Sequence, residues 1–400
     1  MGSPKKTYLA PTFPIKLKSN MTTKYAKAFP SFVLLFLLAG VALFTACKDE
    51  TDDFTSGSFY PIDPDNDPVD TSTVIMGDTC WAAPISLKKA ADFNQRFTRY
   101  EGWTGGDATY SIPLPDGRTV WLFGDSFIGT VKPDRSRTGG GFHRNAVMVQ
   151  DGDEMTTILG GATAFMEPAE AGWWYWPGHG HAHGDTLQVV WFGFKSTGGG
   201  AWDFAYSSVD VMTFSLPDLT LLSTERKFTD PAVNYGACIL EDGGYLYIYG
   251  SEKQGLSKFL HTARVAGKDL NGDWEYFDGT GWTTDPAQSA RHFAHVSDQF
   301  SVFKNSGRYY LLTQHHVLGG DIYLFDSDNP ANGFHNKKLL YCTPQTNEGN
   351  LFTYNAFAHP QFSSNGELLV SYNVNSSVFA DLFKNADNYR PYFVRVKGWE

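Results

Sequence analysis

The chain has 400 residues, a net charge of −11 and a sequence pI near 5.4. Binding to nucleic acid is not expected, because phosphate recognition needs a basic surface. Aromatic residues make up 16% of the chain, and several stand in turn-rich segments, where stacking on sugar rings suits them better than core packing.

Residues 1–46 are predicted to be a signal peptide. Lys24 and Lys27 precede an apolar run over residues 32–44, which is too short to cross a bilayer as a helix. Met21 opens a more conventional signal peptide, so it is an alternative start.

The run Leu43-Phe44-Thr45-Ala46-Cys47 resembles a bacterial lipobox. By that resemblance, Cys47 is lipidated and becomes the first mature residue. Residues 47–73 are rich in Asp, Ser, Thr and Pro, a composition that predicts a flexible tether. The folded part is then expected over residues 74–400.

The first predicted hairpin carries two acids. Residues 106–125 are predicted to form a strand, an Asp-Gly turn at Gly117 and a second strand. Asp107 stands ten residues before Gly117 and Asp125 eight after it, so both carboxylates return to the same end of the hairpin. Two neighbouring carboxylates suit a glycoside hydrolase. The alternative is an Asp-rich turn region with a capping Asp.

A strand–turn–strand unit recurs about every 60 residues along the rest of the chain. Each second strand is β-branched and aromatic, and no long helical period appears after Ala91. Five units of about four strands each predict an all-β fold, a five-bladed β-propeller whose sites lie in a central funnel. The turns centre on Gly117, Gly184, Gly243, Gly307 and Gly366.

Two polar positions recur when the units are aligned on these glycines. Both are expected at the funnel, where carboxylates, amides and imidazoles suit polyol recognition and acid–base chemistry. The alternative is that Asp and Asn simply begin strands after loops. The first position holds Asp107, Asn234, Asp298 and Asn355, and the second holds Asp125, Glu252, His315 and Asn373.

His179, His181 and His183 alternate along one predicted strand, so they share a face. A hydrogen-bonding lining of the funnel is favoured over a metal site, because no matching carboxylate cluster accompanies them. The four aromatic side chains of the preceding run, Trp173-Trp174-Tyr175-Trp176, cannot all face one core. Trp176 would therefore stack on a sugar at the funnel rim, or else pack between blades.

Arg144 and Asn145 open another strand after a Gly-rich loop, and Arg144 would clamp a carboxylate or orient one of the aspartates. Hydroxyl groups of the substrate would be held by residues from several blades. The candidate substrate ligands are Arg144, Asn145, Trp176, His179, Asn234, Asp298, His315, Asn355, His359 and Asn373.

At Gly-Trp-Thr-Gly-Gly-Asp107 and Trp-Leu-Phe-Gly-Asp125-Ser the chain resembles a family of Bacteroidota propeller lipoproteins of unknown function, itself similar to five-bladed endo-D-arabinanases. The resemblance covers residues 92–400 and implies that Asp107 and Asp125 are the catalytic pair. Further matching segments are Asn234-Tyr-Gly-Ala-Cys, Tyr247-Ile-Tyr-Gly-Ser, Ala358-His-Pro and Leu369-Val-Ser-Tyr-Asn-Val-Asn375.

We therefore expect a monomeric, cofactor-free glycoside hydrolase, lipid-anchored through Cys47 at the outer-membrane surface, that cleaves a furanose- or arabinose-containing polysaccharide. One of Asp107 and Asp125 would protonate the leaving oxygen, and the other would act as base or nucleophile. Glu252 is the reserve candidate for the acid. The competing classes are a non-catalytic glycan-binding propeller and a metal-dependent enzyme that uses the histidines.

Overall fold

The computed structural model describes residues 75–76, 85–200, 203–255, 257–315 and 318–400. The predicted signal peptide, the tether and Cys47 lie outside the described residues. Within those ranges, no helix is long and apolar enough to cross a membrane.

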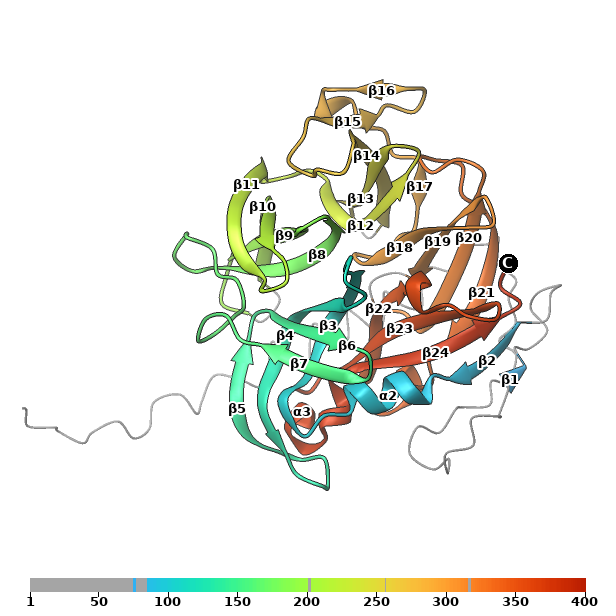
Figure 1. The fold of residues 1–400 in the computed structure, drawn as a ribbon. Coiled ribbons are helices and arrows are strands. Elements are labelled where there is room, and N and C mark those ends of the chain that lie inside the picture. The colour runs from blue at the N-terminus through green and yellow to red at the C-terminus, as the bar shows by residue number, and fades with distance from the viewer. Residues whose placement is uncertain (1–74, 77–84, 201–202, 256, 316–317) are drawn as a thin grey trace, which may run out of the picture. The chain divides into compact units, whose positions relative to one another are not determined.

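Five antiparallel sheets surround a central channel (Figure 1), which confirms the predicted five-bladed propeller. The first strand of each sheet contacts the first strands of its two neighbours, so these five strands form a closed inner ring. They are β3 (Glu101–Pro113), β8 (Trp173–His183), β12 (Asn234–Asp242), β18 (Phe300–Asn305) and β22 (Leu351–Ala358).

The second strands are the partners predicted for each hairpin, and third and fourth strands complete the blades. The second strands are β4 (Thr119–Val131), β9 (Thr186–Ser196), β13 (Tyr245–Gln254), β19 (Arg308–Gln314) and β23 (Glu367–Ser376). The third strands are β6 (Ala146–Asp151), β10 (Phe204–Ser215), β14 (Ser257–Ala266), β20 (Asp321–Ser327) and β24 (Pro391–Lys397). The fourth strands are β7 (Glu154–Ile158), β11 (Thr220–Thr229), β15 (Trp274–Phe277), β21 (His335–Cys342) and β2 (Ser86–Lys89).

Short elements decorate this frame, and one of them lies beside the acid-bearing hairpin. β5 pairs with the second half of β4, whereas β6 pairs with the first half. The additional strands are β1 (Ile75–Met76), β5 (Arg137–His143), β16 (Trp282–Thr283) and β17 (Phe293–Ala294). The helices are α2 (Ala91–Phe97), α3 (Asp381–Lys384) and the 3-10 turns η1 (Pro286–Gln288), η2 (Pro344–Asn347), η3 (Pro360–Phe362) and η4 (Ala386–Asn388).

The last blade is completed by the N-terminal part of the chain. β2 pairs with β24, with Leu87 opposite Val396, and β1 pairs with β2. The ring is thus closed by hydrogen bonds between the two ends of the folded region. Sequence analysis missed this strand because the short segment Ser-Leu-Lys-Lys lacks the apolar pattern and the glycine turn of the repeating hairpins.

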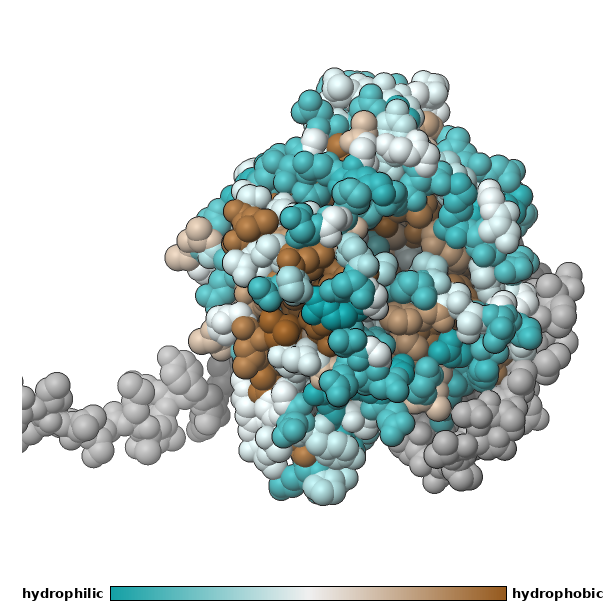
Figure 2. Space-filling view, in the orientation of Figure 1, coloured by the Kyte–Doolittle hydropathy of each residue, from teal (hydrophilic) through white to brown (hydrophobic). Residues whose placement is uncertain are grey.

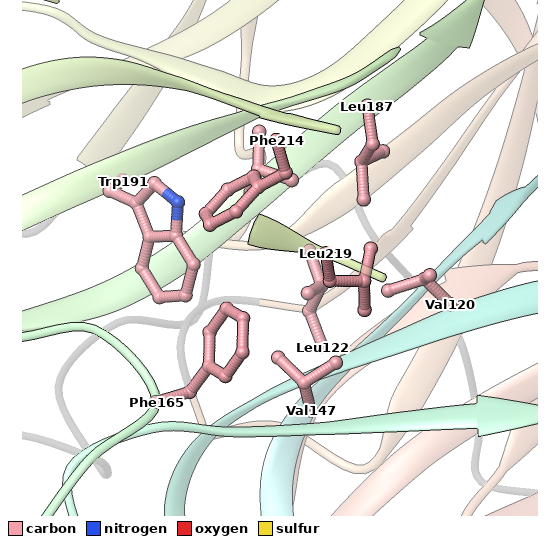
Figure 3. Close-up of a pocket in the computed structure, with 9 residues that line it drawn as sticks. Val120, Leu122, Val147, Phe165, Leu187, Trp191, Phe214 and Leu219 are labelled. Carbon is pink, nitrogen blue, oxygen red and sulfur yellow. The ribbon is translucent and has the colours of Figure 1, made fainter. Parts of the chain in front are cut away.

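Apolar side chains fill the spaces between blades and leave little room for a ligand there. Figure 3 shows one such contact, in which Val120 and Leu122 of the first blade face Leu187 and Phe214 of the second. The cavity among them measures about 10 Å³, no more than one water needs. Figure 2 shows instead a hollow at the centre of the ring of blades, so binding sites belong there.

Backbone bulges interrupt four of the five inner strands. A bulge adds an unpaired residue and changes the direction in which neighbouring side chains point. β18 pairs with β19 without a shift, so it alone keeps the simple alternation. The shifts fall at Gly106/Ala108, Pro177/Gly180, Tyr235/Cys238 and Tyr354/Phe357.

Candidate functional site: a carboxyl pair at one end of the channel

The β3–β4 hairpin places the two aspartates on neighbouring strands, and a bulge in β3 brings Asp107 across from Asp125. Gly106 pairs with Ser126 and Ala108 pairs with Phe123, so Asp107 lies across from the Gly124–Asp125 peptide. Ala108 and the residue after it have φ of 68° and 66°, a backbone conformation that costs energy for a non-glycine residue and clusters at functional sites. Both carboxyl groups remain partly exposed.

Asp107 is oriented by two tyrosines from the last blade. The Tyr354 hydroxyl donates to Oδ2 of Asp107 at 2.7 Å, and the Tyr389 hydroxyl donates to the same oxygen at 3.1 Å. Nδ2 of Asn375 donates in turn to the Tyr354 hydroxyl at 3.2 Å. Because both phenols use Oδ2, Oδ1 is the oxygen left to carry or transfer a proton.

Asp125 is oriented by two donors from neighbouring segments. Nε1 of Trp176 donates to Oδ1 of Asp125 at 2.9 Å, and Nη1 of Arg144 lies 3.4 Å from both carboxylate oxygens. The guanidinium of Arg144 also lies over the Trp174 ring, 4.6 Å from its centroid. Arg144 and Trp176 therefore orient the acid, and the Trp176 ring itself packs against Phe194 and Phe204, with centroids 4.4 Å and 5.1 Å away.

The two carboxyl groups have raised and unequal pKa values. Burial, followed by the charge of Asp125, raises the pKa of Asp107 to about 7. Burial also raises the pKa of Asp125, but Arg144 and the Trp176 hydrogen bond oppose the rise and leave it at about 6. The Arg144 guanidinium, which contacts Asp125, favours the ionised form of Asp125 and so favours Asp107 as the group that holds the proton.

Gly124 leaves the space into which Asp107 extends. A Cβ atom at this position would lie 2.4 Å from Oδ1 of Asp107, so even alanine must displace the carboxyl group. We expect Gly124→Ala to lower kcat/KM about 100-fold, because a displacement near 1 Å has that effect on a reacting group. Gly281→Ala, where a Cβ would meet nothing within 4 Å, is the control, and equal activities of the two variants would contradict the prediction.

A groove of about 280 Å³ adjoins the acid pair at Arg144. Its other walls are Trp173, Trp174 and the segment over residues 163–172. The size approaches that of pockets that hold small ligands, which begin near ~300 Å³. Arg144, whose guanidinium covers the Trp174 ring, thus lies between this groove and Asp125.

Glu252 does not suit the role of reserve acid. Nη2 of Arg291 donates to Oε1 of Glu252 at 2.6 Å, and Nε2 of His261 lies 3.1 Å from Oε2. The hydrogen bond from Arg291 is the main reason why the pKa of Glu252 falls to about 2. A carboxylate that is ionised and paired in this way cannot donate a proton near neutral pH.

Asn145 and His359 are fully buried, which corrects their expected contact with substrate. Nδ2 of Asn145 donates to the Met166 carbonyl at 2.8 Å. The His359 ring bridges the hydroxyls of Ser111 at 2.6 Å and Ser371 at 2.8 Å. Both side chains join strands inside the propeller.

Asn373 is also fully buried, so it too is corrected from ligand to support. Its Nδ2 donates to Oγ1 of Thr109 at 2.9 Å and to the Gly106 carbonyl at 3.3 Å. These bonds fasten the bulge that carries Asp107, so Asn373 acts on the site through the backbone.

The three alternating histidines occupy different environments. Nδ1 of His179 accepts from the Ile239 amide at 2.9 Å, and burial lowers its pKa to about 4, so His179 is a neutral part of the channel lining. Nε2 of His181 lies 3.5 Å from Glu241, and His183 is exposed. Across the residues that the model covers, no group of three or more His, Cys, Asp and Glu side chains is placed to hold a metal ion.

The remaining predicted ligands lie in other blades, each with its own contacts. Asp298 pairs with Lys258, and Asn234 lies opposite Ser251 in the blade-three hairpin. The His315 ring packs edge-on against a tyrosine of β20 at 5.9 Å. Asn355 has φ of 57°, because it belongs to the β22 bulge.

Sequence analysis missed the two tyrosines that contact Asp107. Tyr354 stands next to the predicted ligand Asn355, so the alignment was displaced by one residue where the bulge begins. Tyr389 precedes β24 in a segment without a counterpart in the other units. Only its position between Asp387 and Arg390, in a densely polar stretch, sets it apart in the sequence.

Fold and site together define a five-bladed β-propeller with a carboxyl pair on the hairpin of its first blade. The chain belongs to the family described as domain of unknown function DUF5005, whose model matches residues 90–399. No curated protein matches the chain.

Three of the solved structures that are similar to the chain are described as glycan-cleaving enzymes or as a hydrolase. A presumptive hydrolase from Bacteroides ovatus is 28% identical, with a TM-score of 0.70 over 79% of this chain and 91% of that one. An exo-1,5-α-L-arabinanase from a bovine ruminal metagenomic library is 11% identical, with a TM-score of 0.43 over 74% and 95% of the two chains. An α-L-arabinofuranosidase from Clostridium thermocellum is 14% identical, with a TM-score of 0.42 over 76% and 91%.

Proposed function

We propose that the protein is a glycoside hydrolase that cleaves a furanose- or arabinose-containing polysaccharide. The observation that carries the proposal is the pair of partly exposed carboxyl groups, Asp107 and Asp125, with raised pKa values of about 7 and 6. Two carboxyl groups in different protonation states are what glycosidic bond cleavage needs. The similarity to the presumptive hydrolase from Bacteroides ovatus supports a hydrolytic reaction.

In this proposal Asp107 is the general acid. Its Oδ2 accepts from Tyr354 and Tyr389, so the proton resides on Oδ1 and passes to the leaving glycosidic oxygen. Asp125, which Arg144 and Trp176 stabilise as the carboxylate, acts on the anomeric carbon directly or through a water molecule. The separation of the two carboxyl groups around bound substrate decides between these routes.

The cell-surface location is also part of the proposal. Cys47 would carry a lipid, and residues 47–73 would hold the propeller away from the outer membrane. This placement suits a polysaccharide substrate, because a polymer must meet its enzyme outside the cell. Mass spectrometry of the mature N-terminus tests the lipid directly.

The pKa values predict a narrow pH optimum. Asp125 must lose its proton, at a pKa of about 6, while Asp107 must keep its own, at a pKa of about 7. We expect kcat/KM to rise as pH increases through about 6 and to fall beyond about 7. An optimum above about pH 9 would exclude Asp107 as the acid.

The function is tested by incubating the protein with a panel of plant, fungal and mycobacterial polysaccharides, followed by chromatography of the products. We expect oligosaccharides from an arabinose-containing polymer. Retention on a polymer without any product would instead indicate a glycan-binding propeller.

A further inference from the structure

We infer that an exposed aromatic platform beside the acid pair is a separate glycan-binding subsite. The platform consists of Phe142, Phe379 and Phe383. It would stack on sugar units next to the one that is cleaved, so the inference rests on the proposed function and extends it. Its occupant is the continuing chain of the polysaccharide substrate.

The three rings form a continuous exposed surface. Phe142, Phe379 and Phe383 are 38%, 57% and 43% exposed. The Phe142 and Phe379 centroids lie 6.0 Å apart, and those of Phe379 and Phe383 lie 5.6 Å apart. Single exposed apolar side chains are common, whereas a contiguous group on a polar surface marks a binding site.

A rigid base supports the platform. The Phe127 ring below it is 6% exposed and contacts Phe383 at 5.3 Å and Tyr389 at 5.7 Å. The guanidinium of Arg137 lies over Phe127 at 4.1 Å, and its Nε donates to the Leu382 carbonyl at 2.9 Å. Arg137 thus joins β5 to α3, which lie close together in Figure 1, and fixes the rings in position.

The platform is continuous with both acids. Tyr389, which contacts the platform base, donates to Asp107 at 3.1 Å. On the other side, the Arg144 guanidinium lies 6.0 Å from the Phe142 centroid and its Nη1 lies 3.4 Å from Asp125. A polymer that crosses the acid pair can therefore continue onto these rings.

The chemistry of the platform favours a glycan over other occupants. Flat aromatic faces match the apolar faces of sugar rings. An anionic bilayer would call for a cluster of cations, whereas Lys384, beside Phe383, pairs with Asp381 at 2.8 Å on a chain of net charge −11. Three partly exposed rings also provide far less than the ~800 Å² per partner typical of a stable dimer.

The test measures binding separately from cleavage. Asp107→Asn, alone and combined with Phe379→Ala and Phe383→Ala, is run through native gels that contain linear 1,5-arabinan or mycobacterial arabinogalactan. Phe379→Ala combined with Phe383→Ala should raise the dissociation constant for the polysaccharide about tenfold and so weaken its retention. The matched control in the same background is Leu221→Ala with Leu222→Ala, side chains 42% and 58% exposed on β11, which should bind like the parent.

Each outcome assigns a failure to one proposal. Equal retention of the platform variant and its parent overturns the subsite, whatever the activity. If the platform variant loses retention while Asp107→Asn still hydrolyses the polymer fully, the subsite stands. The assignment of Asp107 as the general acid is then wrong. A parent that neither polysaccharide retains overturns the subsite, and hydrolysis of the same polymers by the wild type then decides the proposed function separately. Platform-dependent binding to anionic lipid vesicles, or platform-dependent dimers, without polysaccharide retention would assign the rings to another partner.

Discussion

Replacing Asp107 by Asn should lower kcat/KM on the cleaved polysaccharide about 10²–10⁴-fold, the usual contribution of a general acid. The amide cannot deliver a proton to the leaving oxygen, but its carbonyl still accepts from Tyr354 and Tyr389. Binding should therefore survive. Steady-state kinetics with chromatographic detection of products measures the loss.

The same variant should be more stable than the wild type at alkaline pH. The folded-state pKa of Asp107, about 7, lies above the ordinary 3.8, so the folded protein keeps a proton that the unfolded chain releases. Stability from this group is therefore complete below about pH 4 and lost as pH rises through about 7. The Asp107→Asn substitution removes this pH-dependent loss in the free energy of unfolding, which is at most about 4 kcal/mol. Thermal unfolding at about pH 8 and pH 4 should show a gain only at the higher pH.

Glu252→Gln is the matched comparison for Asp107→Asn. Glu252 occupies the equivalent ring position of another blade, but its pKa of about 2 keeps it ionised throughout the working range. We expect the variant to retain activity within about threefold, with some loss of stability from the released Arg291. A loss as large as that of Asp107→Asn would move the acid to blade three.

Replacing Asp125 by Asn should have an effect of similar or greater size, because it removes the base or nucleophile. The charge of Asp125 also contributes to the raised pKa of Asp107. Without that charge Asp107 loses its proton at lower pH, so the alkaline limb of the residual activity should shift downward. A pH profile of the variant measures the shift.

An unchanged alkaline limb in Asp125→Asn would show that the two carboxyl groups do not interact. The anomeric configuration of the sugar first released by the wild type separates the two possible roles of Asp125. Retention of configuration indicates that Asp125 is a nucleophile, and inversion indicates that it activates water.

Sequence reasoning located the hairpins because each joins two apolar strands through a glycine turn at a regular spacing. It located Asp107 and Asp125 because both lie on one hairpin, where local counting along two strands is reliable. It failed at Tyr354 because the β22 bulge changes the register just there. A bulge depends on contacts with neighbouring strands, so counting along one strand cannot reveal it.

The misplaced candidates have a common cause. Asn145, His359 and Asn373 stand at positions that polar side chains occupy in any propeller, either facing the channel opening or joining strands below it. The sequence shows that a polar side chain stands at each position but not how deeply that side chain is buried. Glu252 adds a second case, because its partners, His261 on β14 and Arg291 in the loop before β17, come from later segments that no repeat alignment brings together.

The run Trp173-Trp174-Tyr175-Trp176 illustrates what alternation could settle. β8 sends Tyr175 inward, where its hydroxyl donates to Asp210 at 2.7 Å, and sends Trp174 and Trp176 toward Arg144 and Asp125. The expected exposure of some of these rings was therefore derivable from period two alone. Their contact with the acid pair was not, because it crosses between blades.

The most direct test of the acid pair compares the products that the wild type, Asp107→Asn, Asp125→Asn and Glu252→Gln release from arabinose-containing polysaccharides. We predict oligosaccharide products from the wild type and from Glu252→Gln, and release that is slower by about 10²-fold or more from the two aspartate variants. Undiminished product from either aspartate variant, with its fold intact, would contradict the assignment of Asp107 and Asp125 as the catalytic pair.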